Sequence, residues 1–184
     1  MQNESDKVLI DRIQAGDAAA FEAMVIQYQP KLIASLVKYT KSVELSEDIA
    51  QQTFVKVWQK IDTFRGDSAL FTWIYRIGIN LAKNTFNSKI VRNDGITDNL
   101  DNIESLITDN KSPEAYAISV SLKAELDDFL RELPVDLKTA FLLREGDGKS
   151  YEQIATIMDC PVGTVRSRIF RARELILEKF DEIN

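Results

Sequence analysis

Apolar residues recur at helical spacing along most of the chain, and no stretch shows the strict alternation and β-branched enrichment of paired strands. This periodicity predicts an all-α fold. The expected helices cover residues 7–15, 18–29, 31–40, 47–62 and 69–86, and then 114–131, 135–144, 151–158 and 162–180. In the first group, side chains that can accept from free backbone N–H groups mark the helix starts, and these candidate N-caps are Ser5 or Asp6, Asp17, Ser46 and Ser68.

A segment without sustained periodicity separates the two groups of helices. It gathers Asn and Asp and closes on Ser112-Pro113, which is typical of a linker. The sequence therefore predicts two small helical domains, residues 1–88 and 114–184, joined by a flexible acidic linker at residues 89–113.

The charge is unevenly distributed. The net charge of −6 alone argues weakly against nucleic acid, because Lys and Arg drive the release of counterions from phosphates. Residues 54–92, however, carry seven basic side chains against two acidic ones, and residues 166–179 carry five against two. Residues 94–132 hold ten acidic and three basic side chains. Two basic segments, with an acidic segment between them, indicate contact with nucleic acid.

The composition restricts the available chemistry. The chain has no histidine and one cysteine, Cys160, which excludes most nucleophilic triads and most zinc or iron sites. We therefore expect no enzyme, no metal and no cofactor, and a packing role for Cys160 in a reducing compartment. No window reaches the roughly twenty apolar residues of a membrane helix, and the N-terminus lacks the apolar stretch of a signal peptide. A cytoplasmic protein without direct membrane insertion is expected.

The stretch SYEQIATIMDCPVGTVRSRIFRARELI has the outline of a helix-turn-helix. Ser150 and Gln153 fit a capping box, and Asp159-Cys160-Pro161 ends one helix and permits the next. The second helix has an inward apolar stripe formed by Val162, Val165, Ile169, Ala172, Ile176 and Phe180. Its opposite face suits base edges in the major groove, and we assign to bases Ser167, Phe170 and Arg171, and to bases or backbone Arg166 and Arg168. The alternative is a charged face that is merely solvated.

The stretch TFRGDSALFTWIYRIGINLAKNTF suits a single nucleic-acid strand. Its helix is expected to bury Leu70, Ile74, Ile77 and Leu81, which leaves on the other side Thr72, Trp73, Arg76, Asn80, Lys83 and Asn84. An aromatic ring among basic and amide groups can stack on an unpaired base and read its edge. Phe64 and Arg65 lie at the start of this helix. From the pattern alone, Trp73 and Tyr75 fit the core equally well.

The preceding stretch, SEDIAQQTFVKVWQKID, is also amphipathic. Its inward stripe consists of Ala50, Phe54, Val57 and Ile61, and its outward face offers Asp48, Gln51, Gln52, Val55 and Gln59. That face fits a partner helix or plain solvent, and periodicity does not choose between them.

Two of these stretches resemble a known family. EDIAQQTFVKVWQKIDTFRGDSALFTWIYRIGINLAKN is similar to region two of the extracytoplasmic-function sigma factors, and GKSYEQIATIMDCPVGTVRSRIFRARE is similar to region four, most like the sigma-E type. The resemblance implies a monomeric promoter-recognition subunit of bacterial RNA polymerase that serves an envelope stress response. Its implied partners are promoter DNA, the β′ clamp helices and β subunit of core polymerase, and an anti-sigma factor that is often membrane-anchored.

The resemblance also implies roles for individual positions. Those that engage the β′ clamp helices are matched by Asp48, Gln51, Gln52, Val55 and Trp58. Those that melt and read the minus-ten element are matched by Phe64, Arg65, Tyr75, Arg76, Asn80 and Lys83, to which the residue pattern adds Trp73 and Asn84. The minus-thirty-five reader is matched by Arg144, Arg166, Ser167, Arg168, Phe170 and Arg171.

Two other classes of function fit parts of the pattern. A stand-alone regulator would bind a palindromic operator as a dimer through the helix-turn-helix and use the first domain for sensing or dimerisation. A carboxylate-metal nuclease fits less well, because the acidic residues cluster in the linker and nothing orients them.

Overall fold

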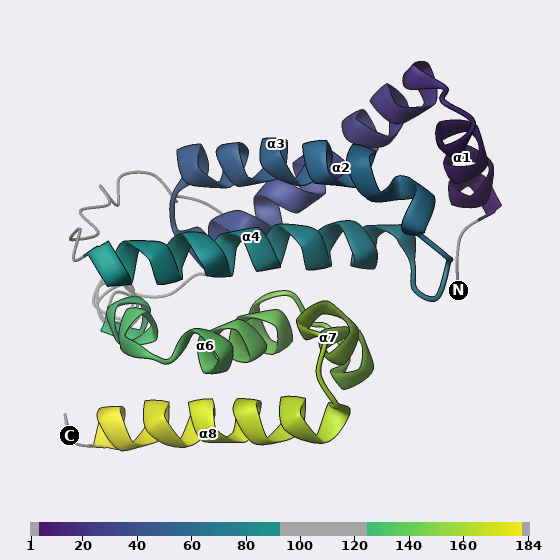
Figure 1. The fold of residues 1–184 in the computed structure, drawn as a ribbon. Coiled ribbons are helices and arrows are strands. Elements are labelled where there is room, and N and C mark those ends of the chain that lie inside the picture. Colours follow the sequence, from purple (N-terminus) through teal and green to yellow (C-terminus); the bar gives the residue numbers. More distant parts are fainter. Residues whose placement is uncertain (1–3, 93–124, 182–184) are drawn as a thin grey trace, which may run out of the picture.

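The computed structural model describes residues 4–92 and 125–181, and every regular element within these ranges is helical, as predicted. The first lobe (residues 4–92) contains α1 (Glu4–Gln14), α2 (Ala18–Thr40), α3 (Val43–Lys60), the 3-10 turn η1 (Ile61–Thr63) and α4 (Leu70–Arg92). The second lobe (residues 125–181) contains a helix at 125–132, α6 (Val135–Phe141), the π-helical turn η2 (Leu142–Gly146), α7 (Tyr151–Met158) and α8 (Val162–Asp181). Figure 1 shows α4 lying between α3 and the second lobe, with α8 on the far edge.

The predicted linker falls mostly outside the described residues. α4 continues helically through residues 89–92, where the linker was expected to begin, while residues 93–113 lie outside the described ranges. The first part of the helix expected at 114–131 also lies outside them, up to residue 124. The domain limits at 88 and 114 stay predictions.

α2 runs as one helix past a proline. The predicted division into two helices around Pro30 is wrong, although proline lacks the N–H of an interior helical bond. Tyr28, Leu32 and Leu36 are buried on a stripe that continues past Pro30. This packing outweighs the cost of an interior proline, which is about 3 kcal/mol.

Two helix starts differ from the prediction. Ser42, not Ser46, is the N-cap of α3, because its side chain accepts from the Leu45 N–H. Ser46 is buried one turn inside the helix, and its hydroxyl donates to the Ser42 carbonyl at 2.6 Å. α1 already begins at Glu4, so neither Ser5 nor Asp6 precedes it as a cap.

Two other predicted caps have different outcomes. Asp17 caps α2 as predicted, accepting from the Ala20 N–H at 3.1 Å. The Ser68 hydroxyl before α4 donates to the Ala69 carbonyl at 3.3 Å, which is not the acceptor role of an N-cap.

α4 is buried on a wider face than the sequence predicted. Leu70 and Ile74 are buried as expected, whereas Ile77 and Leu81 are half-buried. The helix also buries Tyr75, Gly78, Ile79, Ala82 and Phe86, because the second lobe covers it as well as α2 and α3.

Gly78 permits the close approach of α4 to its neighbours. A Cβ at this position would lie 3.1 Å from Leu32 Cδ1 on α2 and 3.3 Å from Thr53 Oγ1 on α3. Both distances are tighter than ordinary van der Waals contact, so a larger residue would require these two side chains to shift.

One apolar core connects the two lobes. Leu143, Ile154, Ile157 and Met158 of the second lobe belong to the same buried cluster as the residues of α2, α3 and α4. α7 packs against α4, which brings the first of the two helix-turn-helix helices onto the first lobe (Figure 1).

Candidate nucleic-acid interface

α7 and α8 form the predicted helix-turn-helix. The capping box is present: Ser150 Oγ accepts from the Gln153 N–H at 3.2 Å, and the Gln153 side chain accepts from the Ser150 N–H at 2.9 Å. α7 ends at Asp159, whose φ of 54° is left-handed. The inward stripe of α8 is buried in its middle, at Val165, Ile169 and Ala172, and half-buried at its ends, at Val162, Ile176 and Phe180.

The opposite face of α8 is open to solvent. Arg166, Ser167 and Arg171 are exposed, and 64% of the Phe170 surface is uncovered. Among the ion pairs of the described residues, Arg171 contacts only two carboxylates of its own helix, with Nη1 3.2 Å from Glu174 Oε2 and 3.9 Å from Glu178 Oε1. A guanidinium, a hydroxyl and an aromatic ring on one exposed face match the groups that read bases in the major groove.

Arg144 and Arg166 share one aromatic ring. The Cζ atom of Arg144 lies 4.8 Å from the centre of the Tyr151 ring, and that of Arg166 lies 5.6 Å from it. Arg144 also donates to the Lys149 carbonyl at 2.9 Å. These cation–π contacts hold both guanidinium groups near the start of α7. Sequence reasoning missed Tyr151, although its place directly after the Ser150 cap was a usable signal.

Arg168 is half-buried and contacts Asp136 of α6. Its Nη2 atom lies 2.6 Å from Asp136 Oδ2, and the other oxygen of Asp136 lies 2.5 Å from Lys83 Nζ on α4. Burial acts to raise the pKa of Asp136, but the hydrogen bonds and charges of Lys83 and Arg168 outweigh it and lower that pKa. A DNA contact by Arg168 stays a prediction and requires this pair to open.

The aromatic residues at the start of α4 pack on one another. Phe64 is buried, and its ring centre lies 5.1 Å from that of Trp73 with the planes tilted by 52°. Trp73 is half-buried and packs against the core, and stacking of a base on its ring stays a prediction. Arg65 is exposed beside them, 3.5 Å from Asp67.

Tyr75 lies beneath the second lobe. It is buried, and its hydroxyl donates to Asp147 at 2.5 Å. Burial and the Asp147 charge raise the pKa of Tyr75 above its ordinary value. The next residue, Arg76, has Nη2 2.8 Å from Asp159 Oδ2. No local pattern could have predicted Asp147 or Asp159 as partners of α4.

The remaining α4 residues assigned to the minus-ten element, Asn80 and Asn84, are exposed. All these assignments in α4 stay predictions. The structure places Asn80 and Asn84 at the surface and the polar groups of Tyr75, Arg76 and Lys83 against aspartates of the second lobe.

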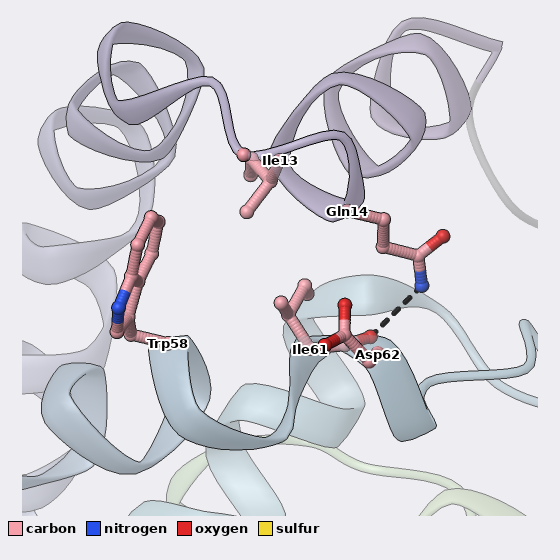
Figure 2. Close-up of a pocket in the computed structure, with 6 residues that line it drawn as sticks. Ile13, Gln14, Trp58, Ile61 and Asp62 are labelled. Atoms are coloured by element: carbon pink, nitrogen blue, oxygen red, sulfur yellow. Dashed lines mark hydrogen bonds between the residues drawn. The ribbon is translucent and has the colours of Figure 1, made fainter.

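The outward face of α3 is exposed as predicted, at Asp48, Gln51, Gln52, Val55 and Gln59. Trp58 is 44% exposed and meets the Phe21 ring edge-on, with ring centres 4.8 Å apart. A pocket of about 210 Å³ opens beside it (Figure 2), lined by Trp58, Ile13, Gln14, Gly16, Ile61 and Asp62. Gln14 Nε2 donates to the Ile61 carbonyl at 2.9 Å and so joins α1 to η1. Aromatic and aliphatic groups beside amides and a carboxylate suit a protein partner.

The described ranges hold neither a candidate metal site nor a helix that could span a membrane. Residues 4–92 and 125–181 contain no group of three or more His, Cys, Asp or Glu side chains that could hold a metal ion. Within this part of the chain, no helix is both long and apolar enough to cross a bilayer.

Both lobes match known families. Residues 24–89 match Sigma-70 region 2, and residues 123–176 match Sigma-70, region 4. The chain is 42% identical to the RNA polymerase sigma-H factor of Pseudomonas aeruginosa, over 96% of this chain and 94% of that one. It is 42% identical to the ECF RNA polymerase sigma-E factor of Haemophilus influenzae, over 97% of each. The sigma factor RpoE of Bartonella quintana, solved with the anti-sigma factor NepR, superposes with a TM-score of 0.54 at 25% identity, over 88% of this chain and 96% of that one.

The chain therefore belongs to the sigma-70 family of RNA polymerase sigma factors, in its extracytoplasmic-function (ECF) class. The predicted resemblance and the all-helical fold with a helix-turn-helix lobe are confirmed. Sigma factors are transcription initiation factors and not enzymes, as the sequence predicted for this chain. Membership in this family excludes the two alternative functions, a stand-alone regulator and a nuclease.

Proposed function

We propose that this chain binds core RNA polymerase through the outward face of α3 and selects promoters with two separate DNA-contacting surfaces. The observation that carries the proposal is the open face of α8, where Arg166, Ser167, Phe170 and Arg171 are exposed together on a capped helix-turn-helix. This face enters the major groove at the minus-thirty-five element, with Arg144 and Arg166 held ready by Tyr151.

The first lobe acts on the minus-ten element. A base leaving the duplex would stack on the aromatic pair of Phe64 and Trp73 and be read by the amides of α4. Unstacking costs a few kcal/mol, and stacking on an aromatic side chain returns about 1–3 kcal/mol per base. The exchange is nearly balanced, so initiation depends on a close match to the promoter.

Polymerase binding uses the exposed polar face of α3. Its residues Gln51, Gln52 and Val55 offer amides around an aliphatic centre, and Trp58 adds a half-open aromatic ring. The partners are the β′ clamp helices and the β subunit of core polymerase, so the chain works in the cytoplasm. Its inhibitor in an envelope stress response is a membrane-anchored anti-sigma factor. The solved structure of a similar sigma factor bound to the anti-sigma factor NepR supports an anti-sigma partner.

The test is co-elution of the purified chain with core polymerase from a size-exclusion column. A sigma factor gives a stoichiometric complex that withstands dilution to nanomolar concentration, because core binding is a stable interface. Elution of the chain apart from core polymerase at every ratio would reject the proposal.

A further inference from the structure

Acidic side chains of the second lobe face cationic side chains of the first. The ion pairs across the lobes are Lys38 with Asp147 at 2.9 Å, Lys41 with Asp127 at 2.7 Å, Arg76 with Asp159 at 2.8 Å, and Lys83 with Asp136 at 2.5 Å. In each of these pairs the carboxylate belongs to the second lobe and the cation to the first. At the contact between the lobes, the ion pairs therefore place positive charge on the first lobe and negative charge on the second.

Three of these aspartates contact side chains of α4 that we assign to the minus-ten element. Asp136 contacts Lys83, Asp159 contacts Arg76, and Asp147 accepts from the Tyr75 hydroxyl at 2.5 Å. Carboxylates on cations take the place that DNA phosphates would occupy, so the same α4 groups cannot serve both.

Asp136 links this contact to the other DNA surface. One of its oxygens lies against Lys83 on α4, and the other lies 2.6 Å from Arg168 on α8. One carboxylate thus engages a residue from each of the two assigned DNA-contacting surfaces.

The position of Asp147 strengthens the contact. Its side chain is 7% exposed, and it receives hydrogen bonds from Tyr75 and Lys38, which lie on different helices of the first lobe. Beside it, Lys149 lies 5.7 Å from the Phe71 ring centre and 5.8 Å from the Tyr75 ring centre, so this loop covers the aromatic face of α4. These contacts and the apolar packing of α7 together bury Tyr75.

We propose that Asp136, Asp147 and Asp159 form an inhibitory latch that closes the second lobe over the minus-ten surface of the free chain. The latch rests on the proposed function, because it assumes that α4 reads promoter DNA. In the closed chain the single strand and the aspartates compete for the same groups, and any partner that binds the separated lobes better shifts the chain toward the DNA-competent state. The apparent affinity for the single strand falls by the fraction of chains that are open.

The experiment compares two triple variants of the full chain with equal charge changes. The latch variant is Asp136→Asn, Asp147→Asn and Asp159→Asn, and Asn also tolerates the left-handed φ of 54° at position 159. The matched control carries Asp11→Asn, Asp128→Asn and Asp181→Asn, at exposed positions outside the contact between lobes. Run-off transcription with core polymerase on a library randomised at the minus-ten element first supplies an active promoter.

Binding of each free chain to the fluorescent non-template minus-ten strand of that promoter is then measured by anisotropy. The latch variant is expected to bind at least about tenfold more tightly than wild type, as if an open fraction of one tenth or less became dominant, and the control is expected to match wild type. Equal affinities for the latch variant and the control, with initiation intact in both, would overturn the latch alone. A library without any initiation would overturn the proposed function and the latch with it.

A second measurement needs no variant. The radius of gyration of the wild-type chain, measured by small-angle X-ray scattering, is expected to increase when the minus-ten strand saturates it, because the lobes must part. An unchanged radius at saturation would also overturn the latch, even if the latch variant failed to fold.

Discussion

The Nη2 atom of Arg76 on α4 lies 2.8 Å from Oδ2 of Asp159, the residue at which α7 ends. The Asp159 side chain is 72% exposed, so water and salt screen this pair. Asp147 crosses the same boundary between lobes with a side chain that is only 7% exposed. Two aspartates with similar geometry should therefore contribute unequally to stability.

Asp147→Ala is expected to lower the free energy of unfolding by about 1.5–3 kcal/mol, because it removes nearly buried hydrogen bonds to a charged group. Asp159→Asn is expected to lower it by less than about 1 kcal/mol, as for other solvent-exposed ion pairs. Urea unfolding followed by circular dichroism measures both. Equal losses in the two variants would show that burial does not set the strength of these contacts.

The buried amine of Lys138 should make the free energy of unfolding depend on pH. It is buried between the lobes, with Nζ 4.9 Å from the Phe86 ring centre and 5.3 Å from the Tyr39 ring centre. Burial and the charges of Lys41 and Arg131 together lower the pKa of Lys138 to about 8, and the charge of Asp127 opposes them.

The unfolded chain therefore binds more protons than the folded chain between the lowered pKa and the ordinary lysine value of 10.5. The free energy of unfolding should rise by about 1 kcal/mol from pH 7 to pH 9. Urea unfolding at the two pH values measures this rise, and Lys138→Met should remove it. A stability that falls over this interval in the wild-type chain would contradict the buried cation.

The two DNA surfaces should respond differently to substitution. Arg171→Ala is expected to weaken binding to a minus-thirty-five duplex by about 1–3 kcal/mol and to relax base preference, because it removes an exposed guanidinium that can pair with guanine. Asn80→Ala should leave duplex affinity unchanged and impair promoter opening. Electrophoretic mobility shifts and permanganate footprinting of the holoenzyme separate the two effects. The same loss of duplex affinity in both variants would contradict this division.

Trp58 should be a strong contributor to polymerase binding. It is 44% exposed and supported edge-on by Phe21, so Trp58→Ala removes a large aromatic contact without opening the main core. We expect a loss of about 2 kcal/mol or more in core affinity, measured by fluorescence titration. Val43→Ala is the matched control, since Val43 is 52% exposed on the same helix but outside the assigned face. Equal effects of the two substitutions would remove Trp58 from the interface.

The sequence predicted the features whose causes lie within a few residues. The capping box of Ser150 and Gln153 and the cap at Asp17 depend on groups three residues apart, and both are present. The inward stripe of α3 is fully buried because α2 and α4 cover that side of the helix. The exposed face of α8 likewise followed from helical spacing.

Features that depend on distant segments could not be predicted from local patterns. Pro30 does not divide α2, because packing on both sides of it continues one buried stripe. The Tyr75 hydroxyl bonds to Asp147, seventy-two positions away, and this contact leaves no periodic trace in the sequence. For the same reason Arg168 reads as a free basic residue in sequence, although its partner Asp136 lies thirty-two positions away.

Run-off transcription with purified core polymerase tests the proposed function most directly. On a promoter that carries matched minus-ten and minus-thirty-five elements, addition of the chain to core polymerase should give transcripts from one defined start, and Arg171→Ala should reduce them. Transcription that is the same with and without the chain, at every promoter tested, would contradict its role as a promoter-selecting subunit.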